Sequence, residues 1–162
     1  KLKNRENFSV IFLKSMNVEK TKEFMLRKID LVMSMGTAAL DGAKLGIPTV
    51  LLDASYKKVD KKYRFKWLFE SDGSNVAQFI EYKEFINNNH SFDQIISAYF
   101  KDANNIGFKC KQYVNKNHST RAVSKKLLDI AHISNLKWGD LDKTLTKKSF
   151  IRKLYEKKIK YE

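Results

Sequence analysis

The segment 30–53, DLVMSMGTAALDGAKLGIPTVLLD, has the pattern of a strand, a turn, a helix and a second strand. The apolar runs at 30–33 and 47–52 have the length and the β-branched content of buried strands. Between them, Gly36 opens a run of small residues that predicts a helix over 38–45. Because parallel strands need a crossover connection and a helix supplies it, this order predicts a parallel βαβ unit with the usual right-handed crossover.

The same alternation continues on both sides of this unit. The apolar run at 8–13 and the run at 76–80 each predict a further strand, and 53–75 reads as a charged, irregular excursion. Gly46 stands where a C-cap glycine ends the helix over 38–45. Three more helices are expected: two follow the N-cap residues Asn17 and Ser91, and a third begins at Ser119. We therefore predict an α/β chain with a Rossmann-like parallel sheet flanked by helices over 1–141.

The last twenty-one residues differ in character, and 142–162 is predicted to be a basic amphipathic helix outside that domain. Over 144–161, seven basic residues surround an apolar seam of Phe150, Ile151, Leu154, Tyr155 and Ile159. Three interpretations stay open for this helix. It lies on an anionic membrane leaflet, it packs back across another domain, or it is a surface helix whose Lys stems cover an apolar face.

Composition bounds the class of protein. The 162 residues suffice for one ordinary domain with a real core, since 43% are hydrophobic. The single cysteine, Cys110, excludes an internal disulfide and fits a reducing compartment, so we expect a cytoplasmic location. No apolar run approaches the roughly 18–20 residues of a membrane span, and no signal peptide opens the chain. The formal charge of +14 is compatible with a solvated lysine surface, and equally with attraction to phosphates, nucleic acid or anionic lipid.

The turn at Gly36 suits a phosphate group. Glycine lets the backbone turn sharply and a ligand approach closely, and the first N–H groups of a helix, with its dipole, favour an anion. Thr37, Ala38 and Ala39 would supply those N–H groups, and Asp41 follows about one turn along, within reach of a ribose hydroxyl. A tight βα turn without any ligand is the plainer interpretation of the same residues. Neither a dinucleotide fingerprint nor a P-loop is present.

The wider string 35–50, MGTAALDGAKLGIPTV, resembles the donor-binding motif of GT-B glycosyltransferases, in which G-T-x-x-L-E-(G/A)-x-x-x-G-x-P recurs. Lipid A disaccharide synthase and the capsular polysaccharide and lipopolysaccharide transferases carry this motif. The resemblance covers roughly residues 8–132. It implies that Gly36, Thr37 and Ala38 bind the donor diphosphate through backbone N–H groups. It also implies that Asp41, where the family usually has Glu, binds the ribose, and that the loop Lys14, Ser15 and Met16 contacts the base.

This resemblance implies the C-terminal, donor-binding part of an enzyme that transfers a sugar to a bacterial surface polysaccharide or glycolipid. The expected partners are a nucleotide-sugar, a glycan or glycolipid acceptor, and an anionic membrane surface at 144–161, at the inner face of the cell membrane. The family's acceptor domain and general base lie in an N-terminal half that this chain does not contain, so no catalytic residue is named. No cofactor, metal or nucleic acid is expected, and the chain alone should be inactive.

Two other functions remain as alternatives. A basic nucleic-acid-binding module would use the charge together with Trp67 and Phe69 beside Arg64 and Lys66, although these aromatic side chains are more simply anchors of a long loop. A sugar-nucleotide 2-epimerase shares the architecture but needs further carboxylates and a histidine in its site.

The remaining polar candidates are expected to be structural or exposed. The three histidines, His90, His118 and His132, have no metal-ligand spacing, and Cys110 has no partner that would activate it. Asp53, after the strand at 47–52, is expected to be solvated, with a place facing the site as the alternative.

Overall fold

The computed structural model describes residues 9–13, 16–72, 75–81, 88–135, 137 and 140. Two compact units make up the chain, Lys1–Ser124 and Lys125–Glu162. The predicted boundary at 141 stays a prediction, and the basic helix predicted at 142–162 lies outside the described residues.

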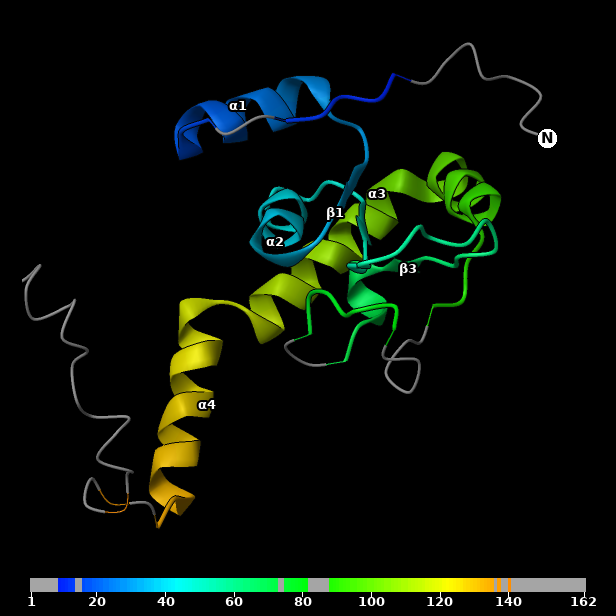
Figure 1. The fold of residues 1–162 in the computed structure, drawn as a ribbon. Helices are drawn as coiled ribbons and strands as arrows, with labels where there is room; N and C mark the ends of the chain where they lie inside the picture. The colour runs from blue at the N-terminus through cyan, green and yellow to red at the C-terminus, as the bar shows by residue number, and fades with distance from the viewer. Residues whose placement is uncertain are drawn as a thin grey trace, which may run out of the picture. The chain divides into compact units, whose positions relative to one another are not determined.

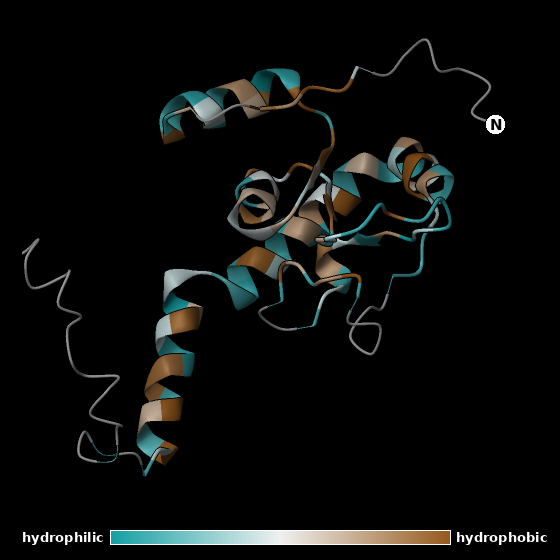
Figure 2. Ribbon diagram, in the orientation of Figure 1, coloured by the Kyte–Doolittle hydropathy of each residue, from teal (hydrophilic) through white to brown (hydrophobic). Residues whose placement is uncertain are grey.

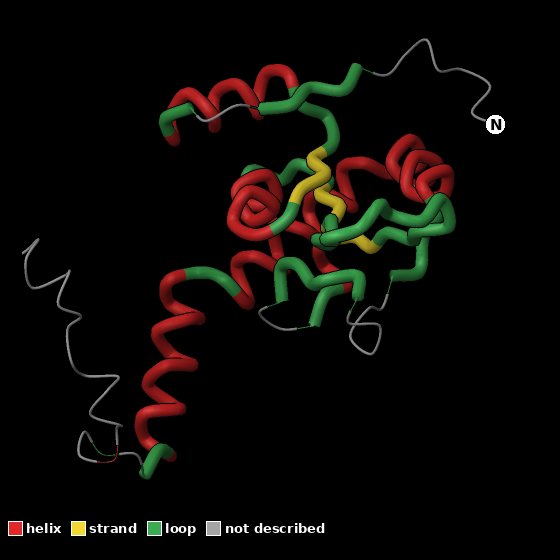
Figure 3. The backbone as a smooth tube through the Cα atoms, in the orientation of Figure 1, coloured by secondary structure: helices red, strands yellow, loops and turns green. Residues whose placement is uncertain are grey.

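The sheet of the first unit is small and mixed. It contains β1 (Val32–Ser34), β2 (Thr49–Leu51) and β3 (Lys66–Trp67), in the order β1-β2-β3. Strands β1 and β2 are parallel, whereas β3 runs antiparallel to β2. The prediction of a wholly parallel sheet is therefore wrong at β3. The reason lies in the connection, because β2 and β3 are joined by a loop (Figure 3), not by a crossover helix.

The βαβ unit predicted at 30–53 is confirmed. Helix α2 (Gly36–Lys44) connects β1 to β2 and begins two residues before the predicted start. Gly46 has a φ of +82° and donates its N–H to the carbonyl of Ala43, 2.9 Å away, as a residue closing a helix does. Four residues of this unit, Ala39, Ala43, Val50 and Leu51, have no exposed surface and belong to the core.

Helices α1 (Val18–Lys28) and α3 (Phe92–Asn117) begin where their caps predicted. Asn17 Oδ1 accepts the N–H of Lys20 at 2.9 Å. Ser91 and Gln94 form a capping box, in which each side chain accepts the other's backbone N–H at 3.2 and 2.7 Å. These hydrogen bonds join residues close together in the chain, so the sequence alone could predict them.

Helix α3 packs against α2 and against the sheet (Figure 1). The contact with α2 is close at Gly107, where any Cβ atom would clash with the carbonyl oxygen of Gly46. Cys110, one turn further, has no exposed surface, and its thiol lies 3.7 Å from the carbonyl oxygen of Thr49. Burial raises the pKa of the Cys110 thiol to about 11, which makes it unreactive, as the sequence led us to expect.

The strand predicted at 8–13 is wrong over its described residues. Residues 9–13 have no regular structure, and Val10 and Phe12 are 79% and 89% exposed. A run of β-branched and aromatic residues favours the extended conformation, but a strand forms only where a neighbouring strand pairs with it through hydrogen bonds. No described strand lies beside this run.

The region after β2 also departs from the prediction. At 76–80 only an isolated parallel bridge forms, between Ala54 and Phe79, and the full strand expected there is absent. The excursion at 53–75 is not wholly irregular, since it contains β3 and the 3-10 helix η2 (Leu68–Glu70). Trp67 is 3% exposed and Leu68 is fully buried, so the loop is anchored by its apolar residues, as expected for Trp67.

Helix α4 (Thr120–Ile133) begins one residue after its predicted start at Ser119, whose hydroxyl accepts the N–H of Ala122 at 3.2 Å. None of its residues is buried, although apolar residues recur along its whole length (Figure 2). Among the described residues, no helix combines the length and the apolar composition that crossing a membrane requires.

Candidate functional site

The turn between β1 and α2 has the open backbone that the sequence predicted. Gly36 has a φ of +63°, and a Cβ atom added there would meet nothing within 4 Å. Its own N–H donates to the carbonyl of Val76 at 3.0 Å, so this amide already has an acceptor. Of the three amides assigned to a diphosphate, those of Thr37 and Ala38 therefore remain for a ligand. Both of these residues are exposed.

Helix α2 starts without a side-chain cap. Met35 occupies the N-cap position in an extended conformation, and its side chain makes no capping hydrogen bond. The other described α-helices start after a residue whose side chain accepts a first-turn N–H: Asn17, Ser91 and Ser119. A helix start without such an acceptor leaves N–H groups that water or an anion can satisfy.

Ser34 lies at the carboxyl end of β1, two residues before Gly36. Its Oγ is buried and has no hydrogen-bond partner within the part of the chain that the structure describes. Its carbonyl accepts the N–H of Leu52 at 2.9 Å, which brings the carboxyl ends of β1 and β2 together. In open sheets with parallel strands, this edge is where ligands bind.

Asp53, just after β2, is 9% exposed, so the expectation that it is solvated is wrong. Its carboxylate accepts hydrogen bonds from Tyr63 Oη at 2.9 Å, Asn88 Nδ2 at 2.8 Å and the N–H of Gln78 at 3.1 Å. Burial raises the pKa of Tyr63, and the nearby carboxylate raises it further. Because the Asp53 carboxylate holds three separate segments together, we assign it a structural role.

The other predicted binding residues are placed only in part. Asp41 is exposed on α2, four residues after Thr37, and so lies on the same side of the helix one turn on. Met16 is 41% exposed, whereas Lys14 and Ser15 lie outside the described residues. The structure thus groups Gly36, Thr37 and Ala38 on one turn with Asp41 beside it.

The aromatic–basic surface considered for nucleic acid does not form as envisaged. Trp67 and Lys66 are each 3% exposed. The Trp67 ring stacks on Phe69 with 6.5 Å between centroids, and Lys109 Nζ lies 5.6 Å from the Phe69 centroid. These side chains pack with one another and do not present a free stacking face.

His90 is structural. Its Nε2 lies 2.8 and 3.1 Å from the two carboxylate oxygens of Glu70, and Glu70 Oε2 also accepts the N–H of Trp67 at 2.8 Å. This pair ties η2 to the segment before α3. No group of three metal-ligating side chains occurs among the described residues.

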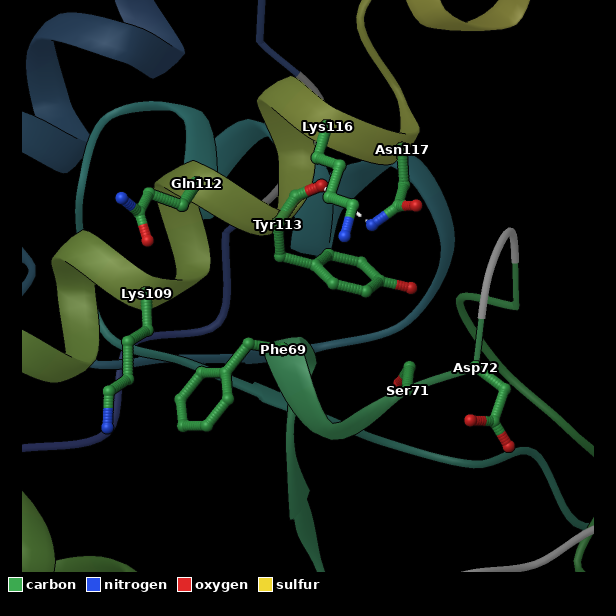
Figure 4. Close-up of a pocket in the computed structure, with 8 residues that line it drawn as sticks. All are labelled: Phe69, Ser71, Asp72, Lys109, Gln112, Tyr113, Lys116 and Asn117. Atoms are coloured by element: carbon green, nitrogen blue, oxygen red, sulfur yellow. Dashed lines mark hydrogen bonds between the residues drawn. The ribbon is translucent and has the colours of Figure 1, made fainter. Parts of the chain in front are cut away.

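A groove of about 440 Å³ lies between η2 and the C-terminal half of α3, and no sequence pattern predicted it. Its lining residues come from two segments: Phe69, Ser71, Asp72, Lys109, Gln112, Tyr113, Lys116 and Asn117 (Figure 4). Ser71 is 8% exposed, and its Oγ has no hydrogen-bond partner among the described residues. The groove is polar and carries two ammonium groups and one carboxylate, but it shares no lining residue with the turn at Gly36.

Comparison with known proteins finds no relative of this chain. No protein-family model matches the chain, and neither a curated protein nor a solved structure matches it significantly. What is shown of this chain is therefore its fold, an α/β structure with a small mixed sheet flanked by helices.

Proposed function

We propose that this chain is the nucleotide-sugar-binding part of a GT-B-like glycosyltransferase that serves a bacterial surface polysaccharide or glycolipid. The observation that carries the proposal is the start of α2, where an open glycine turn precedes a helix without a side-chain cap. The ordered string 35–50 and the βαβ unit around it support the same assignment.

The chemistry proposed for this turn is anion binding. The amides of Thr37 and Ala38, together with the dipole of α2, hold the diphosphate of the donor. When the sugar is transferred, negative charge develops on the departing nucleoside diphosphate. Fixed N–H donors stabilise that charge without reorganising, which lowers the barrier electrostatically.

Two neighbouring residues would complete the donor site. Asp41, one turn further on α2, accepts hydrogen bonds from the ribose hydroxyls. The buried Ser34 hydroxyl, which has no partner within the described chain, is a candidate donor to a phosphate oxygen. The acceptor and the catalytic base are assigned to another part of the enzyme.

The test is a titration of UDP, GDP and CMP into the ¹⁵N-labelled chain, followed by NMR. We expect one of them to shift the amides of Thr37, Ala38 and Ala39 before any others. An Ala38→Asp variant should abolish these shifts, because the carboxylate occupies the anion's place at the helix start. An acidic residue in a first turn is favourable to the helix, so this variant should remain folded.

The matched control is Ala122→Asp, at the same position of α4, where Ser119 already caps the helix. It should leave nucleotide binding unchanged. The proposal fails if no nucleotide shifts the amides of 37–39 at millimolar concentration, or if Ala38→Asp binds as the parent chain does.

A further inference from the structure

Helix α4 exposes an apolar face. Leu127, Leu128 and Ile130 are 61%, 61% and 58% exposed, and Ala131 lies between them on the helical wheel. We call these four residues the α4 apolar face. Such a continuous set differs from the single exposed apolar residues that are normal on protein surfaces, and it indicates a surface that something covers.

The charged residues of α4 are mostly basic, three against one. Arg121, Lys125 and Lys126 lie on the other side of the helix, and Asp129 is the only acidic residue of α4. An apolar stripe opposite a Lys- and Arg-rich face is typical of helices that lie in the interface of an anionic membrane.

Two other occupants are disfavoured by the same charges. A second copy of the chain would bring its own three basic residues of α4 against the first set, on molecules that each carry a formal charge of +14. The chain's own segment 144–161 contains seven basic residues and one acidic residue, so it is repelled as well. Nucleic acid would match the lysines but would leave the apolar face uncovered.

We propose that α4 docks on a membrane containing anionic lipids. Its apolar face enters the boundary between head groups and acyl chains, and Lys125 and Lys126 remain at the level of the lipid phosphates. With 14 residues the helix lies in the surface plane and does not span the bilayer. This proposal is independent of the nucleotide site.

Flotation of the whole chain with vesicles tests the proposal. The vesicles contain phosphatidylcholine alone or with 30% phosphatidylglycerol, a composition chosen for about physiological surface charge. We expect binding to the anionic vesicles only. A Leu127→Gln/Ile130→Gln variant should lower the partition coefficient by about tenfold or more, and Lys125→Gln/Lys126→Gln should lower it by about fivefold per lysine.

The matched control is Val18→Gln/Leu26→Gln, which removes two exposed apolar side chains from α1, where they are 77% and 57% exposed. This variant should float as the parent does. Absence of binding to either vesicle overturns the proposal, and so does binding that Leu127→Gln/Ile130→Gln leaves intact. Concentration-dependent dimerisation that the same variant abolishes would assign the face to a second copy instead.

Discussion

Helices α2 and α3 differ in whether the chain supplies hydrogen-bond acceptors for the N–H groups of their first turn. At α3, Ser91 and Gln94 satisfy the helix start from within the chain. At α2, Met35 contributes no such bond, and the turn before the helix is held by the Gly36 N–H on the carbonyl of Val76. The first arrangement gives stability directly. The second lacks the stability that a capping hydrogen bond provides, but its first N–H groups remain free to bind a ligand.

The difference implies that α2 is anchored at its far end. There Gly46 meets Gly107 of α3, and the contact is too close for a side chain. A helix that is fixed by packing at its C-terminus can tolerate an uncapped N-terminus. Four substitutions test whether α2 is stabilised at its C-terminus and open at its N-terminus, beginning with the largest expected effect.

Gly107→Ala should be the most damaging change. The new methyl group clashes with the backbone carbonyl of Gly46, which cannot rotate away, so we expect a loss of about 3 kcal/mol in the free energy of unfolding. Urea denaturation measures this loss. Cys110 lies one turn away and is fully buried in the parent chain, so its alkylation in the native state should be faster in the variant. A variant as stable as the parent would show that α2 is not anchored there.

Gly36→Ala should cost about 1–2 kcal/mol, because its φ of +63° is unfavourable for any residue with a Cβ atom. The space around it is open, so the loss comes from backbone strain and not from a clash. Thermal unfolding measures it, and Gly36→Asn serves as the control, since asparagine tolerates this conformation better. Equal losses in both variants would contradict this explanation.

Ser91→Ala should cost about 1 kcal/mol, the usual value of an N-cap. It should leave binding at the turn of α2 unchanged, because the two helix starts are separate. Denaturant titration and the nucleotide titration on the same sample check both statements. Weakened nucleotide binding would mean that the two helix starts are coupled.

Met35→Asp should have the smallest effect on stability and the opposite sign. Residue 35 already has the extended conformation of an N-cap, so an aspartate can accept a first-turn N–H and stabilise α2 by about 0.5 kcal/mol. The same carboxylate should exclude a phosphate. A variant that is more stable and no longer binds nucleotide would make α2 resemble α3, whereas unchanged binding would place the ligand elsewhere.

What the sequence predicted well depends on short-range interactions. Asn17 and Ser91 each bond to an amide three residues on, and the unit at 30–53 needs only its own alternation. Strand β3 was missed because Lys66 and Trp67 pair with residues some sixteen positions earlier, and charged neighbours hide them. Asp53 was misjudged for the same reason, since its donors at 63, 78 and 88 are distant in the chain.

Within α3, Asp102 has a φ of −161° and a ψ of 64°, and its carboxylate accepts the N–H of Asn105 at 3.2 Å, as a residue starting a new helix would. The helix is thus two segments joined end to end. We therefore expect the amides in the first turns of α3 to exchange through a local opening that leaves the second segment in place. The second segment carries Gly107 and Cys110, so the support of α2 survives fraying of the first turns of α3.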